Sequence, residues 1–207
     1  LWNIKVPLNA TEQRAIDADN RAIAREIGIL KRTGETESPR LRNLLLRRSR
    51  HSQSLRSRIS STVTLLRDMK GKKGLVFHES IGAANEIGGA LATEMHRARV
   101  YHSKLGPPTR YQNLLLYTEN QVDVLVTCRA LDEGLDVPNT EFGLISASTS
   151  STRQRIQRLG RIVRINPGKE KAKVITLYAL PHEENLLRAE SEALEGVSNV
   201  HWFEARS

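Results

Sequence analysis

The arginines of one short segment, residues 157–164 (QRLGRIVR), are the side chains in this sequence best suited to chemistry. The segment holds three arginines within seven residues and no acidic residue. On a helix, Gln157, Arg161 and Arg164 share one face, because they are spaced four and three residues apart. A guanidinium group donates paired hydrogen bonds in a planar fork that fits phosphate oxygens. The segment therefore predicts a helix that binds a polyanion, with a solvated basic helix as the alternative.

The residues around this segment indicate a nucleotide-handling domain. Residues 123–128 have the apolar composition of a short buried strand, and a loop that contains Gly134 follows them. A second apolar run, residues 142–145, precedes the arginine segment. The order strand, glycine-bearing loop, strand and arginine-rich helix is typical of α/β domains that bind nucleotides.

Strands and helices alternate from residue 72 onward, and this alternation predicts a parallel, doubly wound sheet of the α/β class. Apolar runs predict strands at 75–78, 99–102, 123–128, 142–147 and 173–180. Helical periodicity predicts helices at 81–97, 109–118 and 152–163.

The first 70 residues have a helical character. After a short extended segment, Asn9 or Thr11 can cap a first helix, and Ser38-Pro39 can begin another. The polar residues 47–54 predict either a break or the exposed middle of one long helix. The expected organisation is a basic helical lead-in, an α/β domain and a helical tail, over residues 1–70, 71–181 and 182–207.

The positive charge of the chain, +9 in total, is concentrated in this lead-in. Residues 1–70 contain 15 Lys or Arg against 7 Asp or Glu, whereas residues 71–207 contain 17 against 16. Between Ser38 and Arg67 there are eight arginines and no acid. This asymmetry indicates a domain boundary and a polyanionic partner for the lead-in. A solvated basic helix that pairs with an acidic surface on a missing part of the protein is the alternative.

Four segments, in order, resemble the signature motifs of superfamily 2 helicases. Residues 74–80 (GLVFHES) resemble motif IV, and residues 125–138 (LVTCRALDEGLDVP) resemble motif V. Residues 157–164 resemble motif VI, and residues 101–105 resemble the short motif that follows the next strand. The pairing of motifs V and VI is most similar to XPB-type DNA helicases and next to restriction-type helicase subunits. It is less similar to DEAD-box RNA helicases, whose motif VI usually opens with His where this chain has Gln157.

The resemblance implies that the chain is a RecA-like domain, the second motor lobe of a two-lobed, ATP-dependent DNA helicase or translocase. In this family the first lobe binds most of ATP and Mg²⁺ through a glycine-rich phosphate loop and an acidic pair. This chain contains no G-x-x-x-x-G-K-[ST] sequence. The first lobe is therefore expected ahead of Leu1, and the chain, which does not begin with Met, is expected to be a fragment without ATPase activity of its own.

The resemblance also assigns residues to the nucleotide side of the site. Arg161 and Arg164 would reach the γ-phosphate and stabilise the charge of the transferring phosphoryl group. Gln157, the first residue of motif VI, would orient the site. Gly134 and Asp136 of motif V would lie near the nucleotide and couple it to the nucleic acid.

Residues that follow neighbouring strands are assigned to the nucleic acid. The carboxyl ends of parallel strands meet at one edge of the sheet, where such folds bind ligands. The residues expected to contact backbone phosphates there are Ser80, His102, Ser103 and Thr127. Phosphate contacts carry no base readout, so binding is expected to be independent of sequence and sensitive to salt. DNA is the expected nucleic acid, and an RNA helicase lobe is the alternative.

Other classes of function are also open to this sequence. One is a non-catalytic nucleic-acid-binding module, and another is a regulatory lobe kept for protein contacts. No apolar stretch approaches the length of a membrane span and no signal peptide is evident, so a cytoplasmic, nucleoid or nuclear location is expected rather than secretion. The single cysteine, Cys128, excludes an intrachain disulfide and is expected to be a small core residue. No metal site is expected within the chain.

Overall fold

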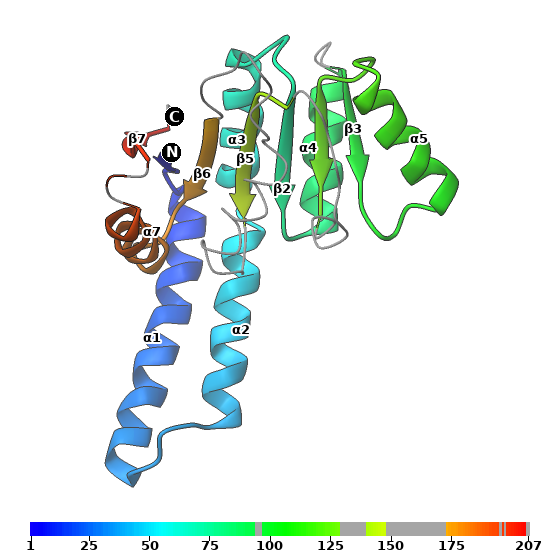
Figure 1. Ribbon diagram of the computed structural model, residues 1–207. Helices are drawn as coiled ribbons and strands as arrows, with labels where there is room; N and C mark the ends of the chain where they lie inside the picture. Colours follow the sequence, from blue (N-terminus) through cyan, green and yellow to red (C-terminus); the bar gives the residue numbers. More distant parts are fainter. Residues whose placement is uncertain (94–96, 129–139, 148–172, 195, 197, 206–207) are drawn as a thin grey trace.

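A parallel sheet organises the part of the chain that the structure describes (Figure 1). The structure is a computed structural model that describes residues 1–93, 97–128, 140–147, 173–194, 196 and 198–205. Within these residues, seven strands follow the order β3-β4-β2-β5-β6-β1-β7, and every neighbouring pair is parallel. The strands are β1 (Trp2–Lys5), β2 (Gly74–His78), β3 (Ala98–Tyr101), β4 (Val124–Thr127), β5 (Phe142–Ala147), β6 (Lys173–Tyr178) and β7 (His201–Glu204).

Helices cover both faces of the sheet. They are α1 (Ala10–Thr33), α2 (Pro39–Gln53), α3 (Arg56–Asp68), α4 (Ile81–Thr93), α5 (Pro107–Thr118) and α7 (Pro181–Ala193). α3 and α4 share a core with one face of the strands, which presents Val76 and Leu144. α5 packs on the other face, where Tyr117 meets Leu75. The predicted α/β fold, a RecA-like doubly wound parallel sheet, is therefore confirmed.

The central strands are buried along their whole length and consist mostly of apolar residues. Every residue of β2, β4 and β5 is buried. A parallel strand covered by helices on both faces has no solvent side, so its sequence is a continuous apolar run rather than an alternating one. This is why short apolar runs located these strands in the sequence.

The two ends of the chain add strands that the sequence analysis did not predict. β1 lies between β6 and β7, and pairs with both of them. The predicted extended segment at the start of the chain is thus part of the sheet, although it precedes the helical lead-in. The rings of Trp2 and Phe203 lie 5.1 Å apart, and those of Tyr178 and Trp202 lie 5.7 Å apart. The terminal aromatic pair, Trp202 and Phe203, therefore packs against the domain.

α1 and α2 form a helical hairpin, which we call the arm, that projects beyond the carboxyl ends of the strands (Figure 1). Asn9 caps α1 in a capping box with Glu12, and Gly34 ends α1 in a left-handed conformation at φ 75°. Ser38 caps α2, with Pro39 in its first turn. α2 ends at Gln53 and α3 begins at Arg56, so of the two alternatives for the polar stretch the structure shows the break, at the end of that stretch.

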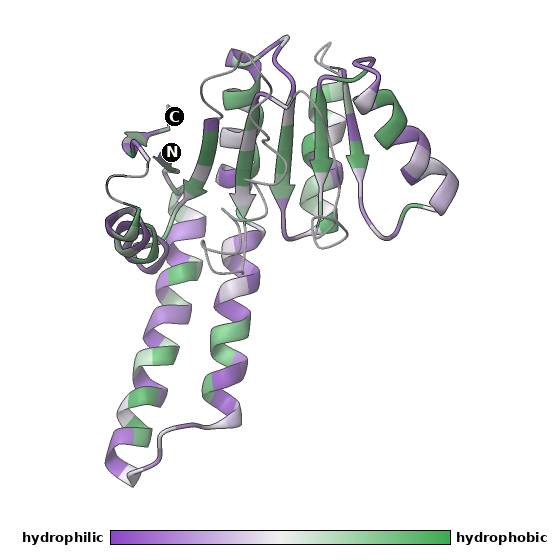
Figure 2. Cartoon of the chain, viewed as in Figure 1, coloured by the Kyte–Doolittle hydropathy of each residue, from purple (hydrophilic) through white to green (hydrophobic). Residues whose placement is uncertain are grey.

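Figure 2 shows that apolar residues dominate the strands, whereas hydrophilic residues line much of the arm. The buried side of α1 contains both apolar and acidic residues. Its members are Ile16, Asp19, Ile23, Glu26 and Leu30, at alternating spacings of three and four residues. Two carboxylates therefore lie within the seam of the arm.

Candidate functional site at the carboxyl edge of the sheet

The residues assigned to the nucleotide lie outside the described part of the chain. They are Gly134, Asp136, Gln157, Arg161 and Arg164. The predicted helix at 152–163 also lies outside it. Their roles therefore stay predictions, and the described site consists of the strand ends that flank them.

Three neighbouring strands bring the residues assigned to nucleic acid to one edge. In the ladders of the sheet, Thr127 at the end of β4 is level with Phe77 in β2 and with Tyr101 in β3. Ser80 follows β2 by two residues, and His102 and Ser103 directly follow β3. Because the three strands are parallel and in register, these residues emerge at the same edge, as predicted from the sequence.

At the end of β2, His78 and Ser80 form a local turn ahead of α4. The Ser80 backbone N–H donates to Nδ1 of His78 at 3.0 Å. His78 is 2 % exposed, and its Nε2 has no hydrogen-bond partner among the described residues. Burial, together with the nearby positive charge of Arg58, lowers the pKa of His78 from 6.5 to about 4, so this imidazole is neutral at pH 7. Ser80 itself is half-buried beside it.

At the end of β3, His102 is buried and Ser103 is exposed. Nε2 of His102 lies 2.9 Å from Oδ1 of Asn85 in α4, a hydrogen bond that ties the loop to that helix. Its Nδ1 has no partner among the described residues. Burial lowers the pKa of His102. At this strand end, Ser103 and Lys104 are the residues that face solvent and can meet a phosphate directly.

Thr127 differs from the expectation. Its side chain is fully buried, and its hydroxyl donates to the backbone carbonyl of Val76 at 3.2 Å. In this structure the hydroxyl therefore stabilises the pairing of β4 with β2, and the predicted phosphate contact has no free donor on this side chain. A threonine at a strand end can turn its hydroxyl either to a ligand or to the sheet, and sequence does not distinguish the two, so the phosphate contact of Thr127 stays a prediction.

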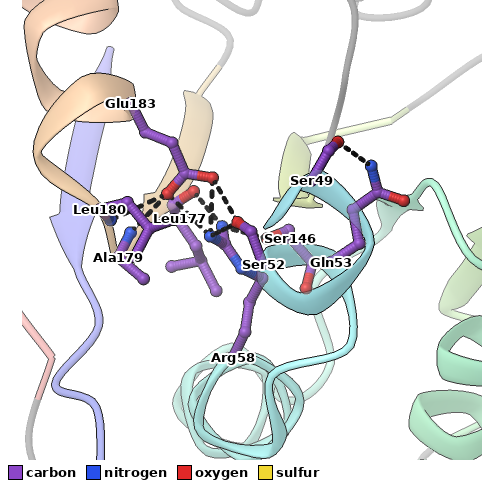
Figure 3. Close-up of polar contacts among 9 residues, drawn as sticks. All are labelled: Ser49, Ser52, Gln53, Arg58, Ser146, Leu177, Ala179, Leu180 and Glu183. Atoms are coloured by element: carbon purple, nitrogen blue, oxygen red, sulfur yellow. Dashed lines mark hydrogen bonds and ion pairs between the residues drawn. The ribbon is translucent and has the colours of Figure 1, made fainter. Parts of the chain in front are cut away.

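A buried arginine that the sequence analysis counted as surface charge connects the elements at this edge (Figure 3). Arg58 of α3 is 1 % exposed. Its Nη1 donates to the backbone carbonyls of Ser146 in β5, at 2.9 Å, and Leu177 in β6, at 2.8 Å. Its Nη2 donates to both carboxylate oxygens of Glu183 in α7, at 2.9 and 2.8 Å.

Glu183 completes this network from the other side. Its carboxylate accepts hydrogen bonds from the backbone N–H groups of Ala179 and Leu180 and from the hydroxyl of Ser52 at the end of α2. Burial alone would raise the pKa of Glu183, but the charge of Arg58 and these hydrogen bonds lower it overall. The pair therefore joins α2, α3, β5, β6 and α7 at the carboxyl edge.

A signal for Arg58 was present in the sequence. Thr62 lies one helical turn after it and is also fully buried, with its hydroxyl 2.7 Å from that of Ser146. Both residues fall beside the apolar row that Leu55, Ile59 and Leu66 form on α3. This position makes Arg58 a candidate for a buried ion pair, but an arginine at the border of a buried face can also extend to solvent, and the sequence does not decide between the two.

Other arginines of the lead-in pair with acids of α1. Asp19 accepts a hydrogen bond from Nε of Arg47 at 2.7 Å, and its second oxygen lies 2.7 Å from Nδ1 of His51. Glu26 lies 3.3 Å from Nε of Arg40. Part of the positive charge of the lead-in is therefore paired with acids of the lead-in itself, a partner that the sequence analysis did not name.

Two kinds of feature are absent from the described residues. No group of three or more His, Cys, Asp or Glu side chains there is arranged to hold a metal ion. No helix among them combines the length and the apolar composition needed to cross a bilayer. Cys128 is buried, as predicted for a core residue.

Comparison with known proteins identifies relatives for this arrangement. Residues 57–166 match the model of the family described as helicase conserved C-terminal domain. The DEAD-box ATP-dependent RNA helicase RhpA of Helicobacter pylori is 26 % identical over 135 residues, which is 65 % of this chain and 27 % of that protein. The DNA 3'-5' translocase XPB2 of Sulfurisphaera tokodaii is 28 % identical over 108 residues, 52 % of this chain and 24 % of that protein. The chain thus spans about a quarter of the length of these curated relatives.

Solved structures confirm the fold. The C-terminal domain of the DEAD-box protein Dbp5 superimposes with a TM-score of 0.61 at 22 % identity, covering 71 % of this chain and 83 % of that domain. Domain 2 of the DEAD-box helicase Mss116p, bound to an RNA duplex, gives a TM-score of 0.60 at 16 % identity, over 72 % of this chain and 60 % of that one.

Replacing Arg58 by Met should destabilise the protein by about 3–5 kcal/mol, because the carboxylate of Glu183 would be left in the interior without its cation. The free energy of unfolding in urea measures this. Arg56→Met is the matched control, since Arg56 pairs with Glu86 at the surface and should cost less than about 1 kcal/mol. Equal effects of the two substitutions would contradict the structural role of Arg58.

Acid should destabilise the protein through His78. The pKa of its folded form lies below that of the unfolded chain, so the unfolded state takes up the proton first and stability falls as the pH drops from 6.5 towards about 4. The loss from this group should approach roughly 3 kcal/mol, at 1.36 kcal/mol for each pKa unit. His78→Asn keeps an acceptor for the Ser80 N–H and cannot titrate, so its unfolding free energy should fall less over this window.

His201→Asn is the matched control for that measurement, because His201 is exposed. Its stability profile should follow that of the unaltered protein. If the profile of His78→Asn did so as well, the neutral buried state of His78 would be refuted.

Proposed function

This chain belongs to the family of helicase conserved C-terminal domains, and we propose that it is the second motor lobe of an ATP-dependent superfamily 2 helicase or translocase that acts on DNA. The observation that carries the proposal is the family match over residues 57–166, because that range contains the segments at 74–80, 125–138 and 157–164. A first lobe elsewhere in the protein would bind most of ATP and supply the ligands of Mg²⁺.

Arg161 and Arg164 would act on the nucleotide when the two lobes close. Their guanidinium groups would stabilise the charge that spreads over the γ-phosphoryl oxygens, an effect worth roughly 10³–10⁵ in rate in well-studied enzymes. Gln157 would orient this arrangement, and Gly134 and Asp136 would lie beside the nucleotide. Each closure and reopening would shift one lobe relative to the other along the nucleic acid.

The carboxyl edge of β2 and β3 would supply the nucleic-acid contacts of this lobe. Ser103 is exposed there and Ser80 lies at the start of α4, so a hydroxyl and backbone N–H groups can meet phosphate oxygens. His102, which is buried and hydrogen-bonded to Asn85, would hold the position of this loop. These contacts would read no bases, so the lobe would bind without sequence preference.

DNA and RNA each have support as the substrate. The motif VI segment opens with Gln157, which resembles XPB-type DNA helicases, and XPB2 is among the relatives. RhpA and the Dbp5 domain are DEAD-box proteins, which favours RNA as the second candidate. We propose DNA as the substrate because motif VI opens with Gln157, and the experiment below also tests RNA.

Arg161→Ala and Arg164→Ala, introduced into the full-length protein, should each lower kcat for ATP hydrolysis by about 10²-fold or more. Arg→Lys at either position should not restore it, because an ammonium group lacks the planar fork. Steady-state ATP turnover, measured with duplex DNA and with RNA in parallel, checks this. If RNA stimulates turnover more strongly than DNA, the proposed substrate is RNA.

Arg188→Ala is the control for these variants, since Arg188 pairs with Glu184 on the surface of α7. It should leave turnover unchanged. Near-normal turnover of both Arg161→Ala and Arg164→Ala would mean that the segment is only a basic surface, and the proposed motor role would fail.

A further inference from the structure

α1 of the arm carries a row of arginines on the side opposite its buried seam. Arg14, Arg21, Arg25 and Arg32 are spaced by seven, four and seven residues, so they fall within about 40° of one another around the helix axis. We call these four residues the outer arginine stripe. All four are exposed, whereas the residues that face α2 are buried. The sequence analysis looked for excess charge between Ser38 and Arg67 and did not identify this row.

The charge of the stripe is not compensated within the described residues. Arg14, Arg21 and Arg25 form no ion pair there, and Nε of Arg32 donates to a backbone carbonyl, that of Gly28. The acids of the arm that pair with arginines, Asp19 and Glu26, are turned inward.

The remaining acids of α1 are engaged elsewhere. Glu12 caps the helix and accepts hydrogen bonds from the backbone and the hydroxyl of Ser57. Asp17, beside the stripe, accepts a hydrogen bond from Gln13. Apart from Asp17, α1 thus carries its carboxylates inside and at the start of the helix and its stripe of guanidinium groups along the outside.

The shape of the stripe suits a long polyanion. Its ends are 18 residues apart, which is about 27 Å on a helix that rises 1.5 Å per residue. The other positions on the same line, Ala18 and Gly28, are small and offer no apolar anchor of the kind that protein interfaces place at their centre. One exposed apolar side chain, Ile29, flanks the stripe at its far end. Phosphate contacts need no such anchor, because released counterions supply the free energy of binding.

We propose that the outer arginine stripe binds the sugar–phosphate backbone of a nucleic-acid duplex, as a second contact outside the carboxyl edge of the sheet. This inference rests on the proposed function. A rigid helix holds the four positions of the stripe on one straight line, and a duplex presents its phosphates along a straight path of that length, whereas a flexible single strand does not. α1 begins directly after β1, so a duplex held by the stripe is positioned relative to the motor lobe by the sheet itself.

The test compares two triple variants of the full-length protein that remove the same charge from different places on the arm. Arg14→Gln, Arg21→Gln and Arg25→Gln together remove the stripe. Lys31→Gln, Arg42→Gln and Arg50→Gln together remove three exposed basic groups that lie off the stripe and have no ion-pair partner among the described residues. The probe is a fluorescent DNA duplex of about 20 base pairs, longer than the stripe at 3.4 Å per base pair, titrated between 50 and 200 mM salt.

The stripe variant should lower the salt slope of log K by about 2–3, at about 0.9 per lost phosphate contact, and weaken binding at the lowest salt by about 10²-fold. The off-stripe variant should change both much less. The same three positions changed to Lys should keep most of the slope, because an ammonium group also releases counterions. Circular dichroism and thermal unfolding confirm that each variant is folded.

Three outcomes would overturn the proposal. They are an unchanged slope in the stripe variant, an equal loss in both triple variants, and a loss seen with single-stranded DNA but not with the duplex. Basal ATP hydrolysis should stay unchanged in both variants, because no residue of the stripe is placed at the nucleotide. Failure of the proposed motor function would instead appear as absent hydrolysis in the unaltered protein, so the two failures are distinguishable.

Discussion

The buried guanidinium group of Arg58 holds together the elements that a motor lobe must keep in fixed relation. A charge in the interior is tolerated only when its hydrogen bonds are satisfied by well-placed partners. Here those partners come from β5, β6 and α7. Ser146, whose carbonyl accepts one of the bonds, lies shortly before the segment that contains Arg161 and Arg164. The hydrogen bond from Arg58 to Ser146 thus holds the end of β5, the last described strand before that segment, in place.

The requirement that a buried charge has well-placed partners also applies to the arm. Asp19 and Glu26 lie within the seam and are accompanied by bases of α2, because a buried carboxylate requires a cation or several donors. The arginines on the far side of α1 form no ion pair among the described residues, although Asp17 lies beside them. Inward carboxylates and outward guanidinium groups give the arm a more basic surface than its composition suggests. The arm begins at the carboxyl edge, so this surface adjoins the site where the domain would bind nucleic acid.

The sequence predicted the sheet because its central strands are covered on both faces and read as continuous apolar runs. It did not predict β1 or β7, since strands of four residues at the ends of a chain give no periodic signal. Among site residues, Ser80 and Ser103 could be placed at one edge from strand order alone. Thr127 and Arg58 could not, because whether a polar group turns into the sheet or out to a ligand depends on partners more than fifty residues away.

Nucleotide-dependent closure of the two lobes is the most direct test of the central claim, that this domain is one half of a split ATPase. Small-angle X-ray scattering of the full-length protein can measure it, with and without an ATP analogue and a DNA duplex. The account predicts a smaller radius of gyration when both ligands are present, and no such change in the Arg161→Ala variant. A radius of gyration that stays the same with both ligands bound would contradict it.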